Sequence, residues 1–398
     1  MTVAPTMLSV FSGVGGLDLG LERAGLSSVG CIEIDPIARR SLKANGRGEW
    51  PLLEPGDVVA QASVLRPADL GLKARGLTVL AGAPPCQPYS KAAMWAPGAW
   101  VGLDDPRADP LFAFLELVEH FKPAAVLMEN VPGFVRGTRS AFSAIGAAFS
   151  DVNVSAGTNY RPHWRVLDAS GYGVPQKRQR AFVVAFRDGR SMKWPDVTHP
   201  DKPCRAWDAL RDIDLGDDMP KANGGWADLL PSIPEGWNYL WHTDRGGGRP
   251  LFGYRTRYWS FLLKLARDQP SWTLPAQPGP STGPFHWDNR PLHVREMLRL
   301  QSFPDTWLVE GTRRQQVVQV GNATPPLLAE IVGRSILATL ELAHRSGPPT
   351  LRIARARQLP SPARRRAVPT RFALLESDHA PHPGSGKGPK PRSDTTAT

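Results

Sequence analysis

A glycine-rich turn between an apolar segment and an amphipathic one is the feature that most constrains the fold of this chain. Residues 7–11 (MLSVF) predict a buried strand, residues 12–16 (SGVGG) a turn, and residues 17–24 a helix that ends at Gly25. A second apolar segment at 29–34 and a helical stretch at 36–44 follow directly. Strand, glycine turn, helix and strand begin a doubly wound α/β sheet, so we predict that fold class.

The alternation of strands and helices continues beyond the first two strands. Residues 78–82, 125–129 and 180–186 predict further strands, and residues 111–121 predict a long helix. Polar or reactive residues adjoin each of these apolar segments. Ligands of open α/β sheets bind outside the carboxyl ends of the strands, so we expect the functional site there.

The domain organisation follows from a change of character after Arg187. A chain of 398 residues accommodates two lobes. Tryptophan, glycine and proline dominate the next segment, which predicts a smaller irregular domain, and helical patterns return at 294–300 and 325–343. We therefore expect a first domain at 1–187, a second domain at 188–282, a return to the first domain at 283–345, and a disordered, basic, proline-rich tail at 346–398.

Composition excludes several classes of protein. No apolar run approaches the roughly 20 residues that cross a bilayer, and residues 1–6 lack a secretion signal, so we expect a soluble, cytoplasmic protein. Cys31, Cys86 and Cys204 are an odd number at wide spacing, which favours neither disulfides nor a zinc site, and we expect no metal. Ten basic and three acidic residues lie from Leu351 onward, so most of the net charge of +11 lies in the tail, either as a solvated end or as a nonspecific contact with a polyanionic partner.

The turn FSGVGG at 11–16 has the chemistry of a cofactor loop. Glycines let a ligand approach the backbone, and the start of the helix offers free amides. A tight corner without a ligand explains the same residues equally well. Glu33 favours the first interpretation, because an acid at the end of the second strand, roughly 20 residues after the glycines, commonly binds the ribose hydroxyls of an adenosine-containing cofactor.

Three further motifs adjoin strands. Prolines surround Cys86 in APPCQPYS (residues 83–90) and fix the direction of its thiol, although a small buried cysteine is the alternative. Glu129 in ENVP follows four apolar residues, which favours a cleft over the solvated surface that is usual for a single acid. The cluster VPQKRQR (residues 174–180) is a set of cations that also suits a solvated face or a phosphate contact.

In this order, the four motifs resemble those of the cytosine-5 DNA methyltransferases. VREMLRLQSFPD at 294–305 and QVGNATPP at 319–326 are similar to the late motifs of that family, and the resemblance extends over residues 7–343 with gaps. It implies a Rossmann-like methyltransferase sheet with a target-recognition domain, S-adenosyl-L-methionine as methyl donor, and double-stranded DNA as substrate.

The resemblance also implies roles for residues at matching positions. Cys86 would attack carbon 6 of cytosine, Glu129 would bind the ring nitrogen and amino edge, Arg180 would hold the carbonyl oxygen, and Arg178 would support them. The expected cofactor residues are Phe11, Ser12, Gly13, Gly15, Gly16, Glu33, Ile34, Asp57, Pro84, Asn322 and Thr324.

The chemistry requires a thiolate, which adds to the ring, makes carbon 5 electron-rich and leaves again once the carbon 5 proton is gone. The target atoms lie inside the duplex stack, so enzymes of this class flip the base out. Residues 89–100 suit a loop that closes over DNA, and 243–259 interleave arginines with aromatic residues. The candidate DNA-binding residues are Ser90, Lys91, Arg245, Arg255 and Arg257.

Rival interpretations remain open at the level of sequence. A tRNA or RNA cytosine methyltransferase of the same fold is the first alternative, and a catalytically silent DNA-binding relative is the second. A nicotinamide dehydrogenase explains the glycine turn and Glu33 but gives Cys86 no role. The compact layout is typical of a bacterial or phage enzyme that acts as a monomer near the nucleoid. Such an enzyme is either half of a restriction-modification pair, with a restriction endonuclease encoded nearby as its partner, or a solitary regulator.

Overall fold

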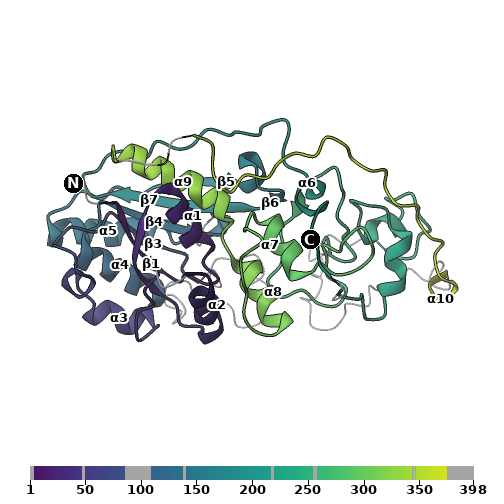
Figure 1. Cartoon of the computed structure of the whole chain (residues 1–398), viewed down its shortest axis with the longest axis horizontal. Coiled ribbons are helices and arrows are strands. Elements are labelled where there is room, and N and C mark those ends of the chain that lie inside the picture. The colour runs from purple at the N-terminus through teal and green to yellow at the C-terminus, as the bar shows by residue number, and fades with distance from the viewer. Residues whose placement is uncertain are drawn as a thin grey trace, which may run out of the picture.

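The computed structural model describes residues 4–46, 50–85, 109–137, 140–216, 219–253, 258–342, 345 and 347–373. They form a first lobe built around a six-stranded sheet and a second lobe composed mainly of loops (Figure 1). The strands are β1 (Thr6–Val10), β2 (Ser27–Ile32), β3 (Val79–Gly82), β4 (Ala125–Asn130), β5 (His163–Asp168), β6 (Gln176–Lys177), β7 (Gln179–Phe186) and β8 (Ser271–Trp272). The helices are α1 (Gly16–Ala24), α2 (Pro36–Gly46), α3 (Val58–Val64), α4 (Asp109–Phe121), α5 (Phe142–Ala156), α6 (Ala206–Leu210), α7 (Val294–Leu300), α8 (Arg313–Asn322), α9 (Pro326–Thr339) and α10 (Thr370–Ala373).

The large sheet has the strand order β2-β1-β3-β4-β7-β5. Strands β1 to β4 pair in parallel, whereas β7 pairs antiparallel with both β4 and β5. Strands β3 and β4 are buried along their whole length, which explains why they read as continuous apolar runs. The predicted α/β fold is confirmed. The reversed direction of β7 was not predicted, and it brings the beginning of this strand to the edge where the parallel strands end.

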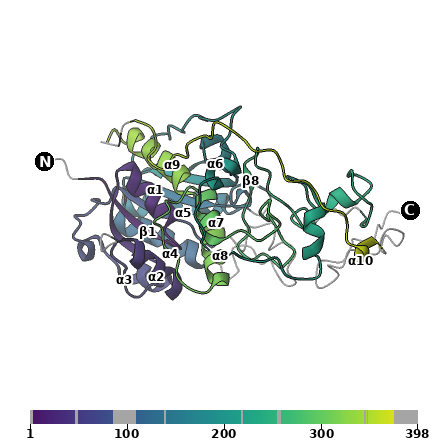
Figure 2. The ribbon, with the colours of Figure 1, turned by 45° about the vertical axis from the view of Figure 1, so that its right-hand side comes forward.

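Helices cover both faces of the sheet (Figures 1 and 2). Leu8 and Val10 of β1 pack with α4 and α5 on one face, and Met7 packs with α1 and α9 on the other, as the alternation of side chains in a strand requires. Helices α1 and α9 approach closely at Gly20, where an added Cβ would lie 2.4 Å from the Cβ of Ala329. Helix α9 is therefore part of the first lobe, although it follows the second lobe in sequence.

The second lobe has an aromatic core of its own. Tyr239, Phe252 and Phe261 are buried there beside the 3₁₀ turn of Ala227–Ser232. A separate apolar cluster joins the lobes: Val14 of the glycine loop packs in it with residues of α6, α7 and α8. The short strand β8 pairs with β6, which ties the second lobe to the chain segment just before β7.

Two of the expected domain boundaries differ from the structure. The segment after 187 does not enter the second lobe at once: Met192 lies in the core beside α9, and Arg190 donates to the carbonyl of Thr339 at 2.7 Å. Within the predicted tail, residues 347–373 are ordered against both lobes, and Phe372 is buried. Composition missed this because the buried carboxylates of Glu330 and Asp208 bind backbone amides of the tail, which any sequence would provide. In the part of the chain that the structure describes, no helix is long and apolar enough to cross a membrane.

Candidate functional site

A cavity of about 300 Å³ lies where β1, β2, β3 and β4 end. Parallel strands leave their carboxyl ends at one sheet edge, which is where ligands of such folds bind. Segments from both ends of the sequence meet there. The described residues that line it are Phe11, Ser12, Gly13, Val14, Gly16, Leu17, Glu33, Ile34, Asp35, Ala38, Ala83, Pro84, Pro85, Glu129, Asn130, Val131, Arg180, Val318, Gln319, Asn322, Ala323 and Thr324.

The glycine turn presents backbone to this cavity. Phe11 has a φ of 60° and Gly13 a φ of 55°, so the chain enters the left-handed region twice within three residues. A Cβ added at Gly13 would meet no atom within 4 Å. This glycine therefore leaves the wall open to a ligand, while the strained conformation of Phe11 is of the kind that collects at binding sites.

Gly15 and Gly16 allow close packing of neighbouring residues rather than leaving space for a ligand. A Cβ at Gly16 would lie 2.2 Å from the carbonyl oxygen of Thr324, and one at Gly15 would lie 2.9 Å from the Trp50 ring. Gly16 lines the cavity, whereas Gly15 does not. Both glycines hold helix α1 close to its neighbours, so the motif combines one ligand-facing glycine with two that permit close packing.

Glu33 fixes the shape of the glycine turn. Its carboxylate accepts from the amide of Gly13 at 2.7 Å and from the amide of Asp35 at 2.8 Å. Burial raises the pKa of Glu33. The neighbouring Ile34 lines the same cavity with 67% of its surface exposed, which is unusual for so large an apolar side chain. A carboxylate with spare lone pairs beside an exposed apolar surface suits a ligand that carries hydroxyls and a flat ring.

Glu129 and Arg180 form the charged part of the cavity. Arg180 Nε lies 2.8 Å from Glu129 Oε1, and the two side chains are 13% and 5% exposed. Burial raises the pKa of Glu129, although Arg180, Arg178 and a hydrogen bond from Thr324 oppose the shift. A carboxyl that readily holds a proton, oriented by a cation, can donate a hydrogen bond to a bound group or accept one from it.

Arg178 lies behind the cavity wall and does not line it. It is fully buried and donates to the carbonyl oxygens of Gly321 and Ala323, each at 2.8 Å. These bonds fix the segment that carries Asn322 and Thr324 into the cavity. Arg178 thus positions this segment of the cavity wall; the supporting role in catalysis expected from the sequence stays a prediction.

Asn130 is a site residue that the sequence analysis missed. Its side-chain amide is buried and donates to the carbonyl oxygen of Pro84 at 2.9 Å, while its own oxygen accepts from the amide of Val131. The bond ties the end of β4, next to Glu129, to the proline loop at 83–85 that lines the cavity. The motif ENVP contained the signal, because an amide directly after a buried acid at a strand end is well placed to bind the neighbouring loop.

Asp18 is the second residue that was missed. It is fully buried on α1 beneath the glycine turn, and it accepts hydrogen bonds from Ser9, Ser12 and the thiol of Cys31. Burial raises its pKa. An acid within an otherwise apolar stretch of helix was the available signal. Asp18 holds the underside of the turn through the serine that lines the cavity.

The remaining expected residues are not all brought to this cavity. Asp57 does not line it; its carboxylate caps helix α3 by accepting from the amide of Val59 at 2.9 Å. Arg245 lies on the surface of the second lobe. Cys86, Ser90, Lys91, Arg255 and Arg257 lie outside the described residues. Among the residues that are described, no group of three or more His, Cys, Asp or Glu could hold a metal ion.

Comparisons with known proteins agree on a single family. The profile described as C-5 cytosine-specific DNA methylase matches residues 6–338. The chain is 36% identical to the Type II methyltransferase M.SacI of Streptomyces achromogenes, covering 84% of this chain and 93% of that protein, and 34% identical to M.Eco47II of Escherichia coli, covering 84% and 79%. The solved structure of the Entamoeba histolytica methyltransferase EhMeth has the same fold, with a TM-score of 0.56 at 17% identity over 84% of this chain and 98% of that one.

Proposed function

The chain belongs to the C-5 cytosine-specific DNA methylase family, and on that premise we propose how the described site methylates cytosine in DNA. The enzyme is a DNA (cytosine-5)-methyltransferase with sequence-specific relatives of Type II restriction-modification systems. The observation that carries the mechanism is the buried Glu129 held by Arg180 at 2.8 Å in the cavity at the sheet edge.

S-adenosyl-L-methionine is the methyl donor in this proposal, and the cavity residues fit it. The carboxylate of Glu33 suits the ribose hydroxyls, and the exposed surface of Ile34 with the ring of Phe11 suits the adenine. Open space at Gly13 leaves room against the backbone, and Pro84, Asn322 and Thr324 form the opposite wall. When bound, the cofactor supplies a methyl group on a positively charged sulfur. Asp57 would contribute only by positioning helix α3.

Cys86, Glu129 and Arg180 carry out the steps of the reaction on the cytosine ring. The Cys86 thiolate forms a bond to carbon 6, and the ring double bond shifts its electron pair toward carbon 5, which accepts the methyl group. Transfer of the carbon 5 proton to solvent then restores the double bond and expels the thiolate, and ring nitrogen 3 returns its proton to Glu129. Glu129, whose pKa is raised by burial, donates its proton to ring nitrogen 3 as negative charge develops, and Arg180 binds the carbonyl oxygen.

The loop that leads to Cys86 is held beside the acid. Ala83, Pro84 and Pro85 line the cavity, and Asn130 bonds Pro84 two residues before the cysteine. Such an arrangement supports a thiol that is presented to the same ring as Glu129. The pocket is far too small for a duplex, so the target cytosine enters it flipped out of the stack.

Recognition of the DNA sequence falls to the second lobe in this proposal. Arg245 there, together with Arg255, Arg257, Ser90 and Lys91, supplies the contacts to base edges and phosphates. The names of the relatives support a role in a restriction-modification system with a cognate endonuclease, and we propose that the enzyme acts as a monomer.

Bisulfite sequencing of DNA from cells that express the protein tests this function. We expect new methylated cytosines in one sequence context, none with Cys86→Ala, and a large loss with Glu129→Gln. Glu119→Gln is the matched control, because Glu119 is a half-buried acid on α4 whose bond to Ser155 is remote from the cavity, and it should methylate as wild type. Methylation that survives Cys86→Ala would refute the mechanism, and its absence from wild type in every context would refute the function.

A further inference from the structure

Residues 347–373, which we call the strap, run from the first lobe to the far end of the second. In Figures 1 and 2 the yellow-green chain leaves α9, passes α6 and ends in α10 on the outer side of the second lobe. The strap has no regular secondary structure before α10. It is held instead at three places, each of which uses a buried side chain.

The first anchor is Glu330 of helix α9 in the first lobe. This carboxylate is fully buried, and it accepts from the amide of Thr350 at 2.9 Å, from the hydroxyl of Thr350 at 3.2 Å and from the amide of Leu351 at 3.3 Å. Arg334 pairs with it at 2.6 Å. A buried carboxylate is costly to leave without partners, so the strap is firmly bound at this point.

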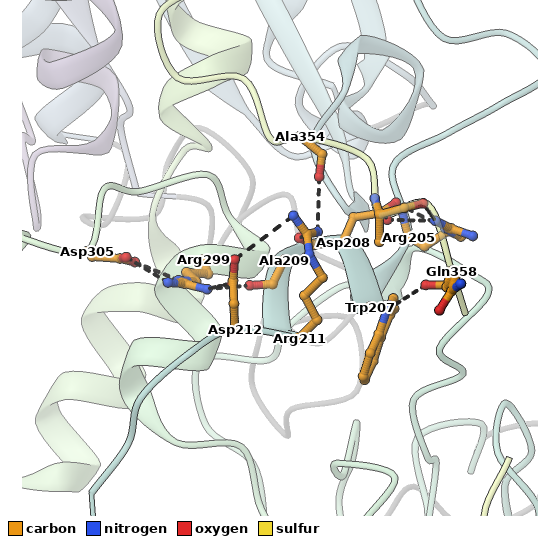
Figure 3. A network of polar contacts seen from close by, with 11 residues as sticks. Arg205, Trp207, Asp208, Ala209, Arg211, Asp212, Arg299, Asp305, Ala354 and Gln358 are labelled. Atoms are coloured by element: carbon orange, nitrogen blue, oxygen red, sulfur yellow. Dashed lines mark hydrogen bonds and ion pairs between the residues drawn. The ribbon is translucent and has the colours of Figure 1, made fainter. Parts of the chain in front are cut away.

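The middle anchor is helix α6, and Figure 3 shows the polar contacts of its residues. The buried carboxylate of Asp208 accepts from the amide of Ala356 at 2.8 Å. Trp207 donates to the carbonyl of Gln358 at 3.1 Å, and Arg211 donates to the carbonyl of Ala354 at 3.1 Å.

Helix α6 is connected in turn to the wall of the cofactor cavity. Arg299 of α7 donates to the carbonyl of Ala209 at 3.0 Å, as Figure 3 also shows. Helices α6 and α7 share the apolar cluster that contains Val14 of the glycine turn. The middle of the strap is therefore joined, through two packed helices, to the loop that lines the cavity.

The third anchor lies in the second lobe. Phe372 is buried in the aromatic core and stacks on Trp226, with ring centroids 5.3 Å apart and an interplanar angle of 17°. Arg371 bonds Asp228 at 2.8 Å, and the guanidinium of Arg365 lies 4.6 Å from the centre of the Trp241 ring. The outer part of the second lobe is thus fastened to the same chain segment as α9 and α6.

We propose that the strap is a positioning element that fixes the second lobe relative to the cofactor cavity. A change in the separation of the lobes must release at least one buried anchor. The reason is that anchors on both lobes hold one continuous segment. The functional consequence rests on the proposed function. If the second lobe reads DNA while the first lobe methylates it, the strap sets the position of the DNA-reading lobe relative to the cavity that methylates the base.

The test compares Phe372→Ala with Phe372→Leu and with the control Leu359→Ala, at a strap residue that is 39% exposed. Phe372→Ala should raise the KM for DNA by about tenfold or more, since a misplacement of about 1 Å in a bound substrate can cost a hundredfold. Its Kd for S-adenosylmethionine should stay within about twofold of wild type, because the cavity is not touched. Phe372→Leu should recover most of the KM, and Leu359→Ala should match wild type.

A second readout measures position without activity. Spin labels are attached at Val154→Cys in α5 and Asn223→Cys in the second lobe, and double electron–electron resonance measures the distance between them. The background carries Cys86→Ser, and Cys31 and Cys204 are buried, so the labels react at the two introduced cysteines. Phe372→Ala should broaden a distribution that is narrow in wild type. Ala356→Pro removes the backbone donor to Asp208 and leaves both lobe cores intact, so it tests the strap even if Phe372→Ala does not fold.

Two results would overturn the proposal: distance distributions that the strap variants leave unchanged, or losses of cofactor and DNA affinity in parallel. A wild-type chain that methylates no DNA would count against the proposed function alone, because the distance measurement decides the role of the strap separately.

Discussion

Replacing Asn130 with alanine should slow methylation while leaving the cofactor bound. The substitution removes the side-chain amide that donates to the carbonyl oxygen of Pro84 at 2.9 Å. Pro84 is buried. An unpaired buried acceptor costs about 1–3 kcal/mol. If the proline loop moves to pair that carbonyl elsewhere, returning it to the productive position before Cys86 costs the same free energy. This cost corresponds to about a fivefold to a hundredfold decrease in rate.

The assay is single-turnover methylation of a DNA duplex that contains the target, with covalent trapping on 5-fluorocytosine as a direct measure of thiol attack. Adduct formation by Asn130→Ala should slow as much as methyl transfer, and the Kd for S-adenosylmethionine should hardly change. Asn153→Ala is the matched control: this asparagine makes comparable bonds, to the backbone of Tyr160 and to Thr158, at the end of α5, remote from the cavity. Equal rates of adduct formation in Asn130→Ala and wild type would falsify the positioning argument.

Three further substitutions test the turn. Gly16→Ala places a Cβ 2.2 Å from the carbonyl oxygen of Thr324, so the free energy of unfolding in urea should fall by about 1–3 kcal/mol; an unchanged urea midpoint would contradict the packing described here. Glu33→Gln weakens the acceptor of the Gly13 amide, and calorimetry should show S-adenosylmethionine binding reduced by about tenfold or more, an expectation that fails if Kd is unchanged. Burial raises the pKa of Asp18 above its ordinary 3.8, so wild-type stability should fall as pH rises through the window between 3.8 and the raised value. Asp18→Asn removes that loss, and its stability relative to wild type should increase with pH across the same window; the opposite slope in urea titrations would refute the reasoning.

The sequence predicted the elements around the site well where each element carries its own signal. Helix α7 begins and ends at the predicted residues 294 and 300, and helix α1 ends at the predicted Ala24, capped by Gly25, whose φ of 119° suits only glycine. Strand β2 was predicted two residues too late, because Val29 to Ile34 continue the apolar pattern while pairing with β1 ends at Ile32. Exposed Ile34 belongs to the cavity rather than to the strand.

Features that depend on distant partners were not predictable. The direction of β7 depends on which strands flank it, and an apolar strand reads alike in either direction. The ordered structure of residues 347–373 depends on Glu330 and Asp208, which bind backbone amides that any sequence would provide. Asp57 illustrates the converse: the family resemblance suggested a cofactor contact, whereas its carboxylate caps helix α3.

By itself, the sequence determined the fold class and the family and predicted a site at the sheet edge, because glycines, prolines and charged residues beside apolar strands carry that information locally. Only the tertiary structure decided which groups meet: Glu129 with Arg180, Asn130 with Pro84, and Arg178 with the segment that carries Asn322 and Thr324. The physical reason is that hydrogen bonds and burial are set by distance in space, and these partners are separated by 46 to 145 residues along the chain.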